Sequence, residues 1–68
     1  TFVAVIFEDE NKTQLYRKDI LPDQIKHWKG LKEIIIESEF MGQYPKNYIV
    51  WPYSAAKGWT NQITGAVK

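Results

Sequence analysis

FVAVIF, residues 2 to 7, is a continuous run of apolar side chains, most of them β-branched or aromatic. Such a run favours a strand that is buried on both of its faces. A polar, turn-prone segment follows, and QLYRKDI, residues 14 to 20, can return antiparallel as the second arm of a hairpin. Lys and Arg discourage further pairing, so this second arm suits the edge of a sheet. We therefore expect residues 2 to 7 and 14 to 20 to form a β-hairpin.

Residues 22 to 30 carry the signals of a short helix. Pro22 stands at a first helical position, Asp23 places negative charge in the first turn, and Gly30 stands where a helix would stop. Three apolar side chains fall on one face of this helix: Leu21, Ile25 and Trp28. A helix of about two turns is not stable alone, so we expect it to pack on a sheet.

Two further segments resemble strands. LKEIIIESEF, residues 31 to 40, contains three consecutive isoleucines, which is the strongest strand signal in the chain. In YIVWPY, residues 48 to 53, alternation places Ile49, Trp51 and Tyr53 on one face and Tyr48 and Val50 on the other. We assign Ile49 and Trp51 to the core. Pro52 cannot donate to a ladder, so this strand is expected to end there or to lie at an edge.

The tail, residues 54 to 68, allows two interpretations. A recurrence of apolar residues every four positions suits a helix that Ser54 opens: Ala55, Trp59, Ile63 and Val67. The last three of these residues are also all odd-numbered, which suits a strand. Because the tail contains several weak helix formers, among them Gly58 and Gly65, we expect an irregular or partly helical tail.

Together these elements predict a single α+β domain over residues 1 to 68. Its sheet is a small single-layer antiparallel one, made of a hairpin and two further strands, with one short helix and the irregular or helical tail. Three of the strands carry large apolar side chains on both faces, and one short helix can cover only one face. The second face must be covered by the tail, by curling of the sheet into a barrel, or by another protein chain. An uncovered apolar patch would mark an interaction site.

The segment GQYPKNYI, residues 42 to 49, resembles the end of Src-homology-three domains. There a glycine, an aromatic or aliphatic residue, a proline, any residue, an asparagine, a tyrosine and a β-branched residue follow one another. The resemblance covers about eight residues and implies an alternative fold, a small all-β barrel. It also implies that Trp28, Pro45 and Tyr48 correspond to the aromatic groove that holds proline-rich peptides in that family.

Composition narrows the function classes. A folded unit of 68 residues buries only about 60% of its unfolded surface and usually recruits disulfides, a metal or a partner subunit. The chain has no cysteine and one histidine, His27, so disulfides are excluded and a zinc site would need mostly carboxylate ligands. We therefore expect no cofactor and no metal. Association with a partner is the remaining support.

The sequence carries no signal for a membrane. No apolar run approaches the roughly 18 residues of a transmembrane helix, and residues 1 to 10 lack the pattern of a secretory signal. We expect a cytoplasmic protein with no membrane partner.

Catalytic motifs are absent from the sequence. It contains no glycine-rich phosphate loop, nucleophile elbow or paired-histidine metal motif. On the predicted helix His27 lies away from the apolar face, and the alternating acids Glu37 and Glu39 would need a shaped cleft to act as an acid and base pair. We predict that the protein is not an enzyme.

The stretch YPKNYIVWPYSAAKGW, residues 44 to 59, points instead to binding. It contains three tyrosines and two tryptophans and no acidic residue. Tyrosine and tryptophan are enriched at binding hot spots, because they bury much area with few torsions to freeze. We predict a small binding protein that acts as a subunit, regulator or inhibitor of a larger protein complex, or that forms a homo-oligomer. The candidate partner-binding residues are Tyr44, Tyr48, Tyr53, Trp59, Lys46 and Lys57.

Single-stranded nucleic acid is the alternative partner. Proteins that bind it combine a cationic groove with aromatic rings on which bases stack. Net charge is +1, but residues 41 to 68 hold three lysines and no acid, whereas all eight acids lie in residues 1 to 40. The aromatic stretch thus lies in the basic part of the chain.

Overall fold

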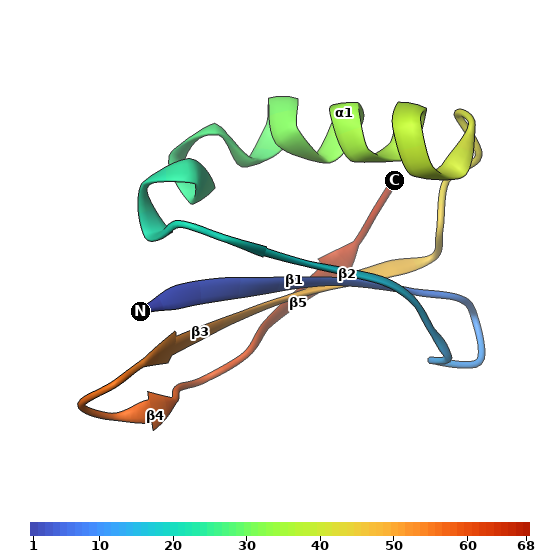
Figure 1. The fold of residues 1–68 in the computed structure, drawn as a ribbon. Helices are drawn as coiled ribbons and strands as arrows, with labels where there is room; N and C mark the ends of the chain where they lie inside the picture. The colour runs from blue at the N-terminus through green and yellow to red at the C-terminus, as the bar shows by residue number, and fades with distance from the viewer.

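The computed structural model describes all 68 residues and contains one antiparallel sheet of five strands with helices along one face (Figure 1). The predicted class, α+β with a small single-layer antiparallel sheet, is confirmed. In chain order the elements are β1 (Phe2–Glu8), β2 (Gln14–Ile20), the 3-10 helix η1 (Pro22–His27), α1 (Trp28–Phe40), β3 (Asn47–Ser54), β4 (Gly58–Trp59) and β5 (Ile63–Ala66).

Strand β1 is the centre from which the sheet extends. It pairs antiparallel with β2 on one side and with β3 on the other, and β4 and β5 both pair with β3. The predicted hairpin of β1 and β2 is confirmed, as is its position at the sheet edge. Residues Val3 to Phe7 are only 0 to 8% exposed, which confirms a strand buried on both faces.

The strand predicted for residues 31 to 40 is wrong, because this segment belongs to α1. Gly30 does not end a helix either; Pro22 opens the 3-10 turn η1, and the α-helix then runs through Gly30 to Phe40. The side chains that contact the core recur at helical spacing: Trp28, Leu31, Ile35, Ile36 and Phe40. Between them stand Lys and Glu residues that favour helix, and this periodicity outweighs the β-propensity of three isoleucines.

Helix α1 ends in a left-handed turn. Met41 and Gly42 have φ angles of 53° and 81°, and the Gly42 amide donates to the Ile36 carbonyl at 3.1 Å. This is the arrangement by which a glycine after the last turn satisfies a free carbonyl. The chain then turns back toward the sheet to begin β3.

The main core lies between α1 and one face of the sheet. Eight buried apolar side chains form it: Val3, Val5, Phe7, Ile20, Ile35, Ile36, Val50 and Val67. Strand β3 contributes Val50 and the half-buried Tyr48 to this core. Ile49 and Trp51, predicted to be the core residues of the strand, point to the opposite face.

The helical alternative for the tail is wrong, since residues 58–59 form β4 and residues 63–66 form β5, while residues 55–57, 60–62 and 67–68 lie outside the strands. Pro52 does not end β3 or put it at an edge: β3 is an inner strand. Pairing with β5 stops at Val50 and pairing with β4 begins at Tyr53, so the proline stands opposite the break between the two short strands. Because proline has no amide hydrogen to donate, that break is where the ladder tolerates it.

The resemblance to Src-homology-three domains does not extend to the fold. The sheet is open and carries a 13-residue helix, so the barrel alternative is wrong. Trp28 and Tyr48 do meet, with ring centroids 5.2 Å apart, but they pack against the main core, and Pro45 is buried. Trp28 and Tyr48 therefore form part of the packing between α1 and the sheet rather than an exposed groove.

Candidate functional site

One face of the sheet carries no helix and no other covering element (Figure 1). We call it the open face. Strand alternation and register determine which side chains point to it. They are Phe2, Ala4, Ile6 and Glu8 of β1, Arg17 and Asp19 of β2, Asn47, Ile49, Trp51 and Tyr53 of β3, Trp59 of β4, and Thr64 and Ala66 of β5.

Four aromatic rings gather at one end of the open face, and we call them the aromatic cluster: Phe2, Trp51, Tyr53 and Trp59. The ring of Trp59 is central, with its centroid 4.6 Å from Trp51, 5.1 Å from Tyr53 and 5.6 Å from Phe2. Phe2 and Tyr53, partners across the β1–β3 ladder, stack at 5.1 Å. Offset and edge contacts of this kind each contribute about 0.5–1.5 kcal/mol beyond the area they bury.

The aromatic cluster shields part of the sheet but remains accessible itself. Ala4, the strand partner of Trp51, is 0% exposed although no helix covers its face, while Trp59 is 41% exposed. The Trp51 indole donates from Nε1 to the Thr60 carbonyl at 2.7 Å, which fixes the chain after β4 against the rings. The result is an ordered apolar surface rather than a set of free side chains.

A charged pair borders the aromatic cluster. The guanidinium of Arg17 lies 5.7 Å from the centre of the Trp59 ring and is also bonded to the Asp19 carboxylate, with Nε and Oδ1 3.0 Å apart. Both side chains are partly exposed. The cation is therefore matched by an adjacent anion, and this part of the face has no net charge.

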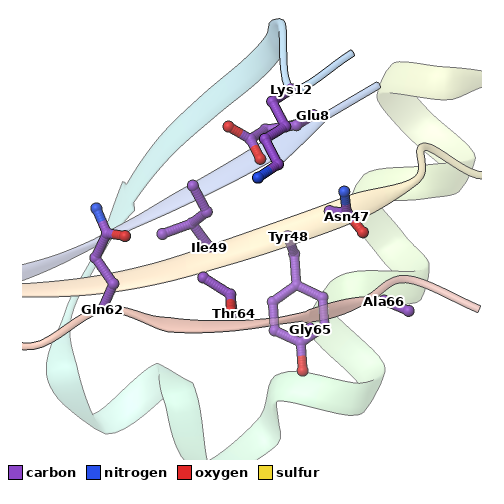
Figure 2. A pocket seen from close by; sticks show the side chains of 9 residues that line it. All are labelled: Glu8, Lys12, Asn47, Tyr48, Ile49, Gln62, Thr64, Gly65 and Ala66. Carbon is purple, nitrogen blue, oxygen red and sulfur yellow. The ribbon is translucent and has the colours of Figure 1, made fainter. Parts of the chain in front are cut away.

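The other end of the open face is a polar hollow of about 560 Å³ (Figure 2). Its lining includes Glu8, Lys12, Asn47, Ile49, Gln62 and Thr64. Five of its nine lining residues belong to the open face by strand register, so the hollow continues that face: Glu8, Asn47, Ile49, Thr64 and Ala66. The open face thus has a projecting aromatic end and a recessed polar end.

The structure brings together two of the six candidate residues, Tyr53 and Trp59, in the aromatic cluster. The two lysines lie apart from each other: Lys46 directly precedes β3, and Lys57 lies in the turn that follows it. The amide of Lys46 donates to the Glu8 carbonyl, and that of Lys57 donates to the Ser54 hydroxyl. They do not form a single basic patch with the rings.

Tyr48 and Tyr44 lie away from the open face. Tyr48 packs against Trp28 on the helix side of the sheet. The Tyr44 hydroxyl donates to the Glu33 carboxylate of α1 at 3.0 Å, and the Lys68 ammonium lies 4.6 Å from the centre of its ring. That hydrogen bond, together with the negative charges of Glu33 and Glu37 and a small desolvation effect, raises the pKa of Tyr44 above its ordinary value.

Sequence reasoning missed Phe2, Trp51 and Arg17 as members of this surface. Trp51 and Tyr53 are two residues apart in one strand, so their side chains point to the same face. No local sequence signal showed that the helix would cover the other face. Phe2 and Arg17 reach the surface only through the register of β1 with β3 and β2. The spacing of Trp51 and Tyr53 was the one sequence signal that could have predicted membership of this surface.

No three His, Asp or Glu side chains stand close enough together to hold a metal ion. His27 is exposed at the end of η1 and lines a shallow groove with Gln24, Gly30, Leu31 and Ile34. No helix is long and apolar enough to cross a membrane.

Comparisons with known proteins add no assignment: no protein-family model, no curated protein and no solved structure matches this chain.

Proposed function

We propose that this protein is a non-catalytic protein-binding domain that docks through its open face, as a subunit or regulator of a larger assembly. The single observation that carries the proposal is the aromatic cluster on a sheet face that no element of the chain covers. Sheets in globular domains normally bury both apolar faces or expose a polar one. A partner protein supplies the missing layer.

The arrangement of the rings supports a protein partner. Their contacts with one another hold them in place before binding, so little side-chain entropy is lost when a partner covers them. Trp59, partly exposed at the centre, has the residue type and the position of a hot spot. The polar hollow beside it offers hydrogen-bonding groups of the kind found at interface rims.

The charges favour protein over single-stranded nucleic acid. Exposed aromatic rings on a sheet are also the platform on which RNA-binding domains stack bases. Here, however, the guanidinium of Arg17 is paired with the Asp19 carboxylate, and the polar hollow is lined by both Lys12 and Glu8. A surface without net positive charge gains little from releasing the counterions of a phosphate backbone.

A bait experiment with matched variants tests the proposal. The tagged chain and its variants Trp59→Ser and Ile34→Ser are incubated in extract of the native source, and the retained proteins are quantified. Ile34 is 65% exposed on the helix side, so it is an equally apolar control outside the open face. We expect at least one protein, a copy of this chain included, to be retained by the wild type and by Ile34→Ser but not by Trp59→Ser. Retention independent of Trp59 for every protein would contradict the proposal.

Titration with a labelled single-stranded oligonucleotide at two salt concentrations tests the alternative. A nucleic-acid-binding protein would bind at low salt and lose affinity steeply as salt rises. We expect no measurable binding at either concentration. Strong, salt-dependent binding that Trp59→Ser abolishes would replace the protein partner by a nucleic acid.

A further inference from the structure

We infer that the occupant of the open face is a second copy of this chain, so that two sheets pack face to face with their helices outside. This inference rests on the proposed function and names its partner. Three features of the open face carry it: its area, the placement of its charges and the complementarity of its two ends.

The outline of the molecule leaves room for a dimer interface of standard size. The Cα atoms span 36 × 24 × 15 Å, and the shortest dimension holds only a sheet and one helical layer. The outline parallel to the sheet is therefore at most about 36 × 24 Å, or roughly 860 Å², and the open face is a part of it. Standard protein interfaces bury about 800 Å² of accessible surface on each partner. Face-to-face packing would complete a sandwich whose inner layer is apolar at its centre.

The register defines one two-fold arrangement in which opposite charges meet. Asp19 is level with Ala4 along β1, and Arg17 is level with Ile6. Consider a two-fold axis that lies between the two sheets, runs at right angles to the strands and passes the level of Val5. Rotation about this axis places each strand antiparallel over the same strand of the other copy. Each Arg17 then faces Asp19 of the other copy, twice by symmetry. An axis along the strands would instead place β2 over the opposite edge of the sheet and leave these charges unmatched.

The same axis matches the shapes of the two ends. The aromatic end, where Phe2, Tyr53 and Trp59 are level with one another, comes to lie over the end where Glu8, Asn47 and Ala66 are level. The latter end contains the hollow of about 560 Å³. Trp51, level with Ala4, comes to lie over Ile49, level with Ile6. The projecting rings of each copy therefore enter the recess of the other.

Sedimentation equilibrium of the purified chain over a concentration series tests the inference. We expect the measured mass to rise with concentration to twice that of the chain. Trp59→Ser should weaken the dimer by roughly 30-fold or more, because it removes the central ring of the aromatic cluster. Ile34→Ser, on the helix side, should leave the dissociation constant unchanged.

A charge exchange tests the arrangement without depending on the aromatic cluster. Arg17→Asp alone and Asp19→Arg alone each bring four like charges together, so each variant should dimerise at least about tenfold more weakly. An equimolar mixture of the two variants restores opposite charges at both contacts, so the mixed dimer should form preferentially. Such rescue requires the charged pairs at residues 17 and 19 of the two copies to lie close together in the dimer.

Two results would overturn the inference: a wild-type chain that stays monomeric up to about millimolar concentration, or a mixture of the charge variants that associates no better than either variant alone. Neither result overturns the proposed function, which fails if no protein is retained through Trp59 in the bait experiment or if the oligonucleotide binds through Trp59. The two failures are therefore distinguishable.

Discussion

The ring of Tyr48 lies over Gly65, its partner across the β3–β5 ladder: a Cβ at residue 65 would stand 2.6 Å from the Tyr48 hydroxyl oxygen. The same ring contacts Trp28 at the start of α1. Tyr48 is thus enclosed between the helix and β5, and it cannot move away without breaking its contact with Trp28. The glycine at residue 65 is what allows β5 to pass beneath the ring.

Glycine-to-alanine exchanges at residues 65 and 30 should therefore have opposite effects. Gly65→Ala forces the Tyr48 ring to shift and should lower the free energy of unfolding by about 1–3 kcal/mol. Gly30 lies inside α1 with nothing within 4 Å of an added Cβ, so Gly30→Ala should raise the free energy of unfolding by about 0.5–1 kcal/mol. Urea denaturation of the two variants measures both changes.

A double variant tests the cause of the first effect. If the clash with Tyr48 is responsible, Gly65→Ala should cost less in a Tyr48→Ala background than in the wild type, because neighbouring residues couple. An unchanged cost would place the effect in the backbone of β5 instead.

Two tryptophans should differ in what they contribute to stability. Trp28 packs against Phe7 and Tyr48 in the main core, so Trp28→Ala should cost about 3–5 kcal/mol. Trp59 packs only on the open face and is partly exposed, so Trp59→Ala should cost about 1–2 kcal/mol. Thermal unfolding is to be measured at high dilution, so that association does not add to stability. Equal losses for the two variants would make Trp59 a core residue and weaken its assignment to binding.

Two tyrosines should ionise late in an alkaline titration. Burial and, secondarily, the charge of Glu39 raise the pKa of Tyr16 above 10.0, and the hydrogen bond to Glu33 chiefly raises that of Tyr44. Since both pKa values are raised on folding, the interactions of the neutral phenols stabilise the fold fully below about pH 10 and are lost as the pH rises through the raised values. Ultraviolet absorbance of tyrosinate should show a late component.

Phenylalanine variants assign that component. Tyr16→Phe and Tyr44→Phe should each remove part of it. A late component that survives in both of the first two variants would contradict these pKa shifts.

The sequence predicted the β1–β2 hairpin and β3, because alternation and turn residues act locally. It misassigned residues 31 to 40, where two local signals conflict. Three isoleucines favour a strand, but Trp28, Leu31, Ile35 and Phe40 recur at helical spacing. Contact with the finished sheet decides between the two patterns, and the two-residue strand β4 depends on the neighbouring β3 in the same way.

The candidate site was predictable in its residue type but not in its membership. The alternation of side chains along β3 correctly placed Tyr48 and Tyr53 on opposite faces of the sheet. Which of these faces lies beneath α1 depends on how the helix crosses the sheet. Trp51 and Tyr48 therefore exchanged roles: the expected core residue joins the aromatic cluster, and the expected surface residue packs under the helix. Arg17 entered through strand register, which no single segment encodes.

Hydroxyl-radical footprinting tests most directly whether the open face is the docking surface. The chain is oxidised once at high dilution and once in its assembled state, and modification is read residue by residue. We predict that oxidation of Trp59 and Tyr53 falls several-fold on assembly, while Met41, which is 89% exposed beyond the end of α1, reacts equally in both states. Equal oxidation of Trp59 in the two states, with protection confined to the helix side, would contradict the account.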